Sequence, residues 1–253
     1  MSEHIIVTQD DAIRIITMRR PEKKNALTQE MYFSIVKAID SAQDDPSIRC
    51  LMIAGSPGAF TAGNDLKDFL AAGSSGEAQG KGSSGGFSLL HALNNNRKPL
   101  VAAVDGIAIG IGTTMMFHCD YVVATKTSTF ATPFVSLGLV PEGASSLLVP
   151  RSIGHQRAFA LLVMGRRLDG EAAREAGFVN QIAATGQAEH EAHLVAKEIC
   201  ALPAEAVAIS RQLLKLPPET IAERFALEGK HFGERMRSEE ALSAFRKFLG
   251  KKA

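Results

Sequence analysis

The sequence has almost no net charge, few cysteines and no uninterrupted membrane-length apolar run. Its 28 basic and 27 acidic side chains leave a formal charge of +1, so no overall field would attract nucleic acid or an anionic membrane. The three cysteines, Cys50, Cys119 and Cys200, lie far apart and form no metal-ligand spacing. The one candidate membrane span, 100–117, is interrupted by glycines, which favours a buried strand and helix.

Targeting signals are also missing. The first nine residues lack a basic stretch followed by an apolar one, and the last residues, Lys251 to Ala253, do not match a peroxisomal SKL signal. An odd number of widely spaced cysteines favours a reducing compartment. We therefore expect a cytoplasmic protein that binds neither membrane nor nucleic acid.

Extended and helical patterns alternate along the chain, which predicts an α/β fold. Short β-branched runs at 5–7 and 13–18 predict a hairpin, and Thr28 is suited to cap a helix that ends near 43. Further strands are expected at 50–54, 100–104 and 121–124, with helices near 87–96 and from Gly110. From about Gly154 only helices are expected, at 155–164, 170–176, 188–202, 204–216, 220–236 and 239–249.

The segment 73–86 is rich in glycine and serine. Such a composition cannot bury enough apolar surface to order itself, which predicts a mobile loop. A linker between two domains is the alternative. The βα alternation continues on both sides of the segment, which favours one interrupted domain.

Three segments combine glycine with polar residues where a buried strand ends, which is where open α/β sheets bind ligands. In 59–66, Gly63 is followed by Asn64 and Asp65, and a helix beginning there would present free amide groups. In 104–112 a strand is expected to run through glycines into a helix, but the spacing fails the dinucleotide-binding pattern. In 130–146, Glu142 stands between a proline and a glycine. Taken alone, it fits a first helical turn, where it would complement the helix dipole.

These segments combine with others in a recognisable order. The markers are RPEKKNAL at 20–27, FTAGNDL at 60–66, KPLVAAVDG at 98–106, Cys119-Asp120, and the segment 165–179. Together they resemble the crotonase (enoyl-CoA hydratase/isomerase) superfamily along nearly the entire chain. The resemblance implies an α/β crotonase (ClpP/crotonase-like) spiral of ββα units over 1–195. A C-terminal helical trimerisation region over 196–253 and a homotrimer or dimer of trimers are implied as well.

The resemblance also implies a site for a coenzyme A thioester. The superfamily holds the thioester oxygen between two backbone N–H groups, which here belong to Asn64 and Ile111. Such donors contribute about 3–4 kcal/mol each to catalysis. Coenzyme A or acyl contacts are implied for the following residues: Lys23, Lys24, Ala26, Ala62, Asp65, Leu66 and Phe134. Arg246 and Lys247 could reach a phosphate, although they equally fit a solvated helix end.

The resemblance further suggests the reaction. Hydratases of the superfamily use two glutamates to activate water, but Thr114 and Phe134 occupy those positions here. The segment 141–146, PEGASS, instead resembles peroxisomal-type Δ3-Δ2-enoyl-CoA isomerases, in which the glutamate after the proline is the base. Glu142 would then shuttle a proton during the isomerisation of 3-enoyl-CoA in fatty-acid metabolism. Apolar neighbours such as Phe134, Leu139 and Val140 would raise its pKa.

Two other functions stay open. The protein could be an enoyl-CoA hydratase or catalyse another crotonase-type acyl-CoA reaction, or it could bind acyl-CoA without catalysis. A metal site at His190 and His193 is disfavoured because their segment is a polar helix face. Cys119 has no base nearby in the sequence that would activate it. We expect no metal and no cofactor other than the coenzyme A that the substrate carries.

Overall fold

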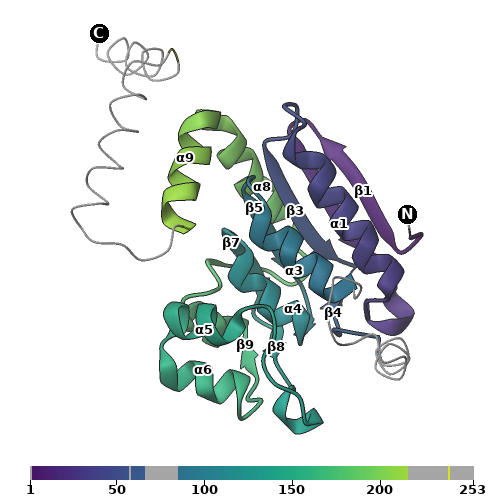
Figure 1. Cartoon of the computed structure of the whole chain (residues 1–253), viewed down its shortest axis with the longest axis vertical. Helices are drawn as coiled ribbons and strands as arrows, with labels where there is room; N and C mark the ends of the chain where they lie inside the picture. The colour runs from purple at the N-terminus through teal and green to yellow at the C-terminus, as the bar shows by residue number, and fades with distance from the viewer. Residues whose placement is uncertain (1, 57, 66–84, 216–238, 240–253) are drawn as a thin grey trace, which may run out of the picture. The chain divides into compact units, whose positions relative to one another are not determined.

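The computed structural model describes residues 2–56, 58–65, 85–215 and 239. The chain divides into two compact units, 1–197 and 198–253. The second unit is described mainly through the end of α8 (Ala188–Ala201) and through α9 (Ala204–Lys215). The predicted site residues of the described part all belong to the first unit (Figure 1).

The N-terminal hairpin and the first helix form as the sequence predicts. Strands β1 (Ile5–Asp10) and β2 (Ile13–Met18) pair antiparallel around a turn in which Asp11 has a φ of 49°. Helix α1 (Gln29–Gln43) begins where the Thr28 side chain accepts a hydrogen bond from the N–H of Met31. Its apolar residues at helical spacing are buried, as predicted, and Tyr32 is buried beside them.

The larger sheet has six strands in the order β1-β2-β3-β5-β7-β10. Apart from the hairpin, its neighbouring strands are parallel. The remaining members are β3 (Cys50–Gly55), β5 (Leu100–Val104), β7 (Tyr121–Thr125) and β10 (Gln181–Ala183). The central strands β3 and β5 are almost wholly buried. Such strands appear in a sequence as continuous apolar runs, which is why these predictions are confirmed.

A second sheet has the order β4-β6-β8-β9. Its strands are β4 (Ala59–Thr61), β6 (Ile107–Ile109), β8 (Thr129–Ala131) and β9 (Leu168–Asp169). Strand β4 follows β3, β6 follows β5, and β8 follows β7. Each turn of the spiral therefore adds one strand to each sheet. The predicted spiral is confirmed. The helix expected from Gly110 is α4 (Ile111–Thr114), with Gly110 as its N-cap. The strand β6 that precedes it was not expected, and Gly106, at φ 85°, turns the chain from β5 into it.

Helices and short 3-10 turns fill the connections of the first unit. They are η1 (Pro21–Lys23), α3 (Gly85–Asn95), α4 (Ile111–Thr114), η2 (Met115–His118), η3 (Val135–Leu137), α5 (Ser145–Ile153), α6 (His155–Leu162) and α7 (Gly170–Ala176). Helices α1 and α3 pack against each other (Figure 1). The expectation of helices alone after Gly154 was wrong, since β9 and β10 follow. Strands of two or three residues are too short to show a period.

Some expectations fall outside the described residues. These are the helix at 220–236, the helix at 239–249 apart from Glu239, and the loop as far as residue 84. The last two residues of the expected loop, Gly85 and Gly86, instead open helix α3. Within the described part, no helix is long and apolar enough to cross a membrane.

Candidate active site

Two amide groups lie at the carboxyl edge of the second sheet. Strands β4 and β6 are parallel neighbours, with Thr61 opposite Ala108. Gly63, at φ 88°, follows β4, and Gly110, at φ 59°, follows β6. A left-handed φ is readily adopted only by glycine, so each turn depends on this residue type. The residues after these glycines are Asn64 and Ile111, the two predicted amide donors.

The direction of the Asn64 N–H follows from its peptide bond. The Gly63 carbonyl in the same peptide group accepts a 2.8 Å hydrogen bond from the N–H of Leu27. This peptide is trans, so its N–H points opposite to its carbonyl and away from Leu27. Asn64 is exposed, and no described residue accepts a hydrogen bond from its N–H.

The Ile111 N–H is oriented by the start of helix α4. The Gly110 carbonyl accepts hydrogen bonds from the N–H groups of Thr113 and Thr114, at 2.9 and 3.0 Å. Since that carbonyl points into the helix, the N–H of the same peptide group points out of its N-terminal end. Here too, no acceptor for this N–H exists among the residues that the structure describes. Among the described residues, both predicted donors therefore have no acceptor, and they lie on adjoining turns.

The side chain of Glu142 is tied to the same helix. Its Oε1 accepts a 2.6 Å hydrogen bond from the hydroxyl of Thr114, which is fully buried and lies one turn after Ile111. Burial raises the pKa of the Glu142 carboxyl, and the Thr114 hydrogen bond lowers it to a smaller extent. The interpretation of Glu142 as a residue of a first helical turn was wrong. Helix α5 begins only at Ser145, and the Glu142 carboxylate is bonded to Thr114.

Close packing holds the turn that carries Glu142. Gly143 has a φ of 66°, and a Cβ there would lie 2.9 Å from the Leu90 side chain of α3. His118 binds the Gly143 carbonyl at 2.9 Å through Nε2, which must donate because a carbonyl only accepts. Phe134 is buried beside Gly110. Val140, by contrast, is 78% exposed and contributes little to the burial of Glu142.

A buried tyrosine joins the site, and the sequence did not reveal it. Tyr32 is 1% exposed, and its hydroxyl donates a hydrogen bond to Oδ1 of Asn64 at 2.5 Å. Burial, and to a smaller extent the charge of Glu142, raise the pKa of the Tyr32 phenol, so it stays protonated. Its only signal in the sequence is a polar aromatic residue among the apolar positions of 29–43.

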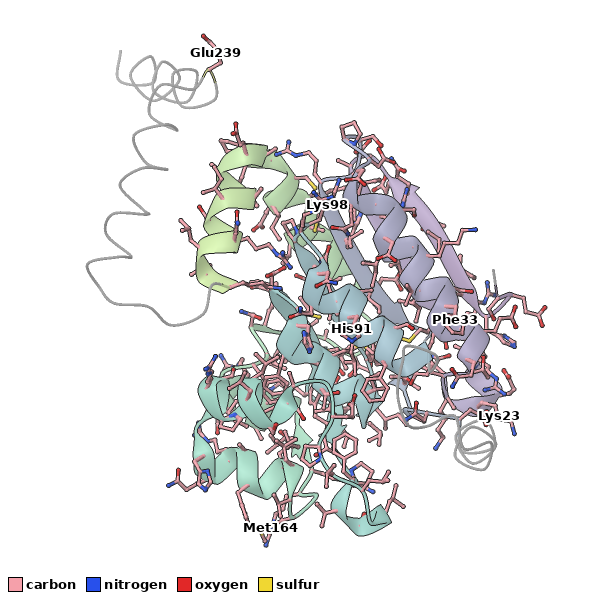
Figure 2. All side chains as sticks on the ribbon, in the orientation of Figure 1. Lys23, Phe33, His91, Lys98, Met164 and Glu239 are labelled. Carbon is pink, nitrogen blue, oxygen red and sulfur yellow. The ribbon has the colours of Figure 1, made fainter. Side chains whose placement is uncertain are left out.

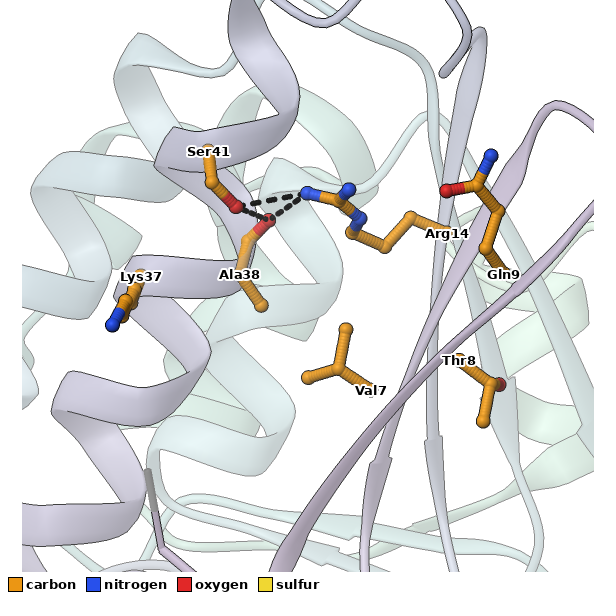
Figure 3. Close-up of a pocket in the computed structure, with 7 residues that line it drawn as sticks. All are labelled: Val7, Thr8, Gln9, Arg14, Lys37, Ala38 and Ser41. Carbon is orange, nitrogen blue, oxygen red and sulfur yellow. Dashed lines mark hydrogen bonds between the residues drawn. The ribbon is translucent and has the colours of Figure 1, made fainter.

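Other places in the described part offer no competing chemistry. A pocket of about 310 Å³ is lined by residues of β1, β2 and α1 (Figure 3). Its Arg14 guanidinium is already bonded to the hydroxyl of Ser41 and the carbonyl of Ala38. No group of three or more His, Cys, Asp or Glu side chains in the described part could hold a metal. His193, considered above as a ligand, pairs with Asp10 at 2.8 Å.

Comparison with known proteins agrees with the fold. Residues 8–253 match the family model described as enoyl-CoA hydratase/isomerase. The chain belongs to this family. It is 33% identical over 253 residues to enoyl-CoA delta isomerase 2 of Rattus norvegicus. This match covers 99% of this chain and 64% of the rat protein. It is also 33% identical over 256 residues to enoyl-CoA delta isomerase 3, peroxisomal, of Mus musculus. That match covers 100% of this chain and 80% of the mouse protein. The chain thus spans less than two thirds of the length of the rat relative.

Solved structures of similar chains share the fold of this enoyl-CoA hydratase/isomerase family member. A protein from Magnetospirillum magneticum AMB-1 aligns with a TM-score of 0.93 and 34% identity, over 100% of this chain and 98% of the other. An enoyl-CoA hydratase from Polaromonas sp. JS666 aligns with a TM-score of 0.91 and 30% identity, over 98% and 97%. The predicted superfamily and fold are confirmed. Because relatives include both isomerases and hydratases, family membership alone does not select the reaction.

Most residues predicted to contact coenzyme A are brought together. The Lys24 carbonyl accepts a 2.9 Å hydrogen bond from the N–H of Ala62. Arg20 donates to the Ala26 carbonyl at 3.0 Å and to the Asp65 carboxylate at 2.7 Å, which links the loop 20–26 to the turn after β4.

The lysines of this loop lie at the surface of the first unit. Lys23 and Lys24 are both exposed, and Figure 2 shows Lys23 at the surface. Leu66, Arg246 and Lys247 lie outside the described residues.

Proposed function

We propose that the protein isomerises a 3-enoyl-CoA thioester to the conjugated 2-enoyl-CoA, with Glu142 as the base. One observation carries this proposal. The Glu142 carboxylate is held by Thr114, one helical turn from the unpaired N–H of Ile111. The proposed base is therefore hydrogen-bonded to helix α4, and the proposed hydrogen-bond donor to the negatively charged thioester oxygen lies at the start of the same helix. This combination suits proton removal next to a carbonyl group.

The reaction balances with one carboxylate. Ionised Glu142 removes a proton from C2, and the electrons move onto the thioester oxygen to give a dienolate. The N–H groups of Asn64 and Ile111 would bind that oxygen as its charge develops. Protonated Glu142 then returns the proton at C4, which moves the double bond into conjugation. Burial favours this double role, since a carboxyl with a raised pKa is both a stronger base and an available acid.

The same residues argue against hydration. Water addition in this superfamily uses two glutamates, and the corresponding positions here hold Thr114 and Phe134. The Thr114 hydroxyl donates a hydrogen bond to the Glu142 carboxylate, and a threonine hydroxyl is neither an acid nor a base at neutral pH. Phe134 is buried and has no ionisable group. The relatives named enoyl-CoA delta isomerases support the isomerase, whereas the hydratase structure keeps hydration as the second candidate.

The test compares two glutamate variants. Glu142→Gln should abolish the formation of conjugated 2-enoyl-CoA from a 3-enoyl-CoA, followed by ultraviolet absorbance. Glu191→Gln is the matched control, because Glu191 is also partly buried and also accepts a hydrogen bond from an uncharged side chain, that of Gln181. The control should keep the wild-type rate. Full activity of Glu142→Gln would refute the assignment of the base.

Measurements on the wild type and on Glu142→Gln distinguish the alternative functions. Wild-type protein that hydrates crotonyl-CoA faster than it isomerises 3-enoyl-CoA would be a hydratase. Protein that binds the thioester without converting it, whether or not Glu142 is present, would be a binding protein. A series of 2- and 3-enoyl thioesters of different chain lengths would then define the acyl preference.

We also propose the contacts and assembly that the superfamily resemblance implies. Coenzyme A would bind along Lys23, Lys24, Ala26, Ala62 and Asp65, and 196–253 would form a trimerisation region of a trimer or paired trimers. No further cofactor takes part in the proton transfer described above. Light scattering measures the assembly, and activity retained after exhaustive dialysis against EDTA checks that no metal is needed.

A further inference from the structure

The two proposed amide donors are supported very differently. Ile111 is 4% exposed and begins a buried helix, so packing and the hydrogen bonds of Thr113 and Thr114 to the Gly110 carbonyl fix its peptide group. Asn64 is exposed, and its backbone is held by a single bridge to Leu27. In that bridge Leu27 donates to the Gly63 carbonyl and accepts from the N–H of Asp65. The Asn64 side chain therefore needs its own restraint if the donor is to stay in place.

Tyr32 supplies that restraint from the protein interior. We propose that the Tyr32 hydroxyl is a positioning group, which holds the Asn64 carboxamide so that the Asn64 N–H stays available to the substrate oxygen. The proposal rests on the proposed function, in which Asn64 is an oxyanion donor. Its geometric basis is the hydrogen bond from the Tyr32 hydroxyl to Oδ1 of Asn64. No other partner of this hydroxyl exists among the described residues.

The restraint comes from a rigid part of the fold. Tyr32 lies in the first turn and a half of α1, directly after the Thr28 cap and the Leu27 bridge. One short segment, 27–32, therefore anchors both the backbone and the side chain of Asn64. Figure 2 labels the neighbouring Phe33, which is 47% exposed, whereas Tyr32 is buried. A buried phenol has few rotamers and can fix its acceptor with little loss of entropy.

The chemistry of asparagine explains why a restraint is useful. A free asparagine side chain readily accepts a hydrogen bond from its own or a neighbouring backbone N–H. Such a bond at Asn64 would occupy an amide that the dienolate oxygen requires. With Oδ1 bonded to Tyr32, this competition is removed. The phenol remains a dependable donor because burial and the nearby charge of Glu142 both oppose its ionisation.

A double-mutant cycle tests the proposal. Tyr32→Phe, Asn64→Ala and the double variant are compared for kcat and KM with a 3-enoyl-CoA. Tyr32→Phe should lower kcat by about three- to tenfold, which corresponds to one uncharged hydrogen bond, with KM nearly unchanged. Because both changes break the same bond, the double variant should be no slower than the slower single variant. The acid side of the kcat profile should keep the wild-type midpoint in Tyr32→Phe.

Tyr121→Phe is the matched control. Tyr121 is the other of the two tyrosines in the sequence, and its hydroxyl also bonds to a side-chain amide oxygen, that of Gln181 at 3.5 Å. It should leave kcat unchanged. If Tyr32→Phe does not fold, as judged by circular dichroism, Asn64→Ser tests the same bond from its exposed side. The serine hydroxyl is too short to replace the carboxamide at Tyr32 but can still accept from a nearby backbone N–H, so kcat should fall below that of Asn64→Ala, which has no side-chain acceptor. A folded Asn64→Ser with the wild-type kcat would then overturn the proposal.

Other outcomes would also overturn it. Multiplicative effects in the cycle, or an acid midpoint that moves in Tyr32→Phe, would mean that Tyr32 acts on Glu142 directly. If the wild type does not isomerise, the proposed function fails, and binding decides the remaining question. The probe is then acetoacetyl-CoA, whose enolate absorbs in the ultraviolet. Tyr32→Phe should weaken enolate binding about three- to tenfold and leave binding of free coenzyme A unchanged. Equal enolate binding would refute the positioning role.

Discussion

Replacing Thr114 with valine would test how the fold tunes Glu142. Valine has nearly the shape of threonine, and Thr114 is fully buried, so the change removes a hydroxyl and little volume. Within the described part, this hydroxyl is the one donor to the Glu142 carboxylate, at 2.6 Å. A hydrogen bond to a charged group contributes about 1.5–3 kcal/mol. Because Glu142 is only partly buried, we take the lower end, about 1.5 kcal/mol, which equals roughly a tenfold change in an equilibrium constant.

The effect should depend on pH in one direction. The Thr114 hydrogen bond stabilises the ionised carboxylate, so its loss raises the pKa of Glu142 further above the ordinary value. At high pH, where Glu142 is ionised in both proteins, the kcat/KM values should be similar. As the pH falls, the variant loses its base first, and its kcat/KM should drop to about one tenth of wild type. The assay is the formation of conjugated 2-enoyl-CoA measured across the pH range.

A matched control separates this effect from a general loss of packing. Thr125→Val also removes a fully buried hydroxyl that donates to a carboxylate, that of Asp105 at 3.2 Å. It should lower stability without a pH-dependent change in the ratio of rates. A folded Thr114→Val variant whose rate ratio to wild type is constant across pH would refute the reasoning, since Thr114 would then not tune the base.

Three further changes probe the same site. Glu142 has a folded-state pKa raised above the unfolded value, so its stability contribution is present at low pH and lost as the pH rises through the folded pKa. Glu142→Gln should thus be more stable than wild type in urea unfolding at neutral pH, a gain that vanishes in acid; no gain would contradict the burial argument. Gly143→Ala, strained at φ 66° and close to Leu90, should lower the free energy of unfolding by about 1–2 kcal/mol and reduce kcat more than thioester affinity. Equal losses of kcat and affinity would show that the turn does not position the base. Asn25→Ala removes a fully buried amide bonded to the Ala59 carbonyl, and should cost about 3 kcal/mol in thermal unfolding; a loss below about 1 kcal/mol would mean that water replaces the amide.

The sequence predicted those parts of the fold whose pattern is local. The buried strands β3, β5 and β7 and helix α1 follow from apolar runs and a capping threonine. The second sheet escaped period-based prediction because β4, β6 and β8 have three residues each. The superfamily resemblance supplied the spiral in its place. It did so through glycine-containing motifs whose turns place those short strands side by side.

The site residues also divide into those that sequence motifs indicated and those whose contacts only the structure shows. The sequence pointed to Asn64, Ile111 and Glu142 through motifs, since each lies beside a glycine that a tight turn requires. At Thr114, the sequence indicated only that a glutamate of the hydratases is absent. The structure shows that the Thr114 hydroxyl holds the carboxylate of a residue far along the chain.

The sequence by itself determined the family, the positions along the chain of the buried strands of the larger sheet, and the residue types of the proposed chemistry. Only the tertiary structure decided which groups meet. The bonds from Tyr32 to Asn64 and from Thr114 to Glu142 join residues 32 and 28 positions apart. No local pattern encodes such pairs, because they depend on how α1, the second sheet and α4 pack together. The pKa of Glu142 depends on the same packing, since burial is a property of the folded chain and not of any segment.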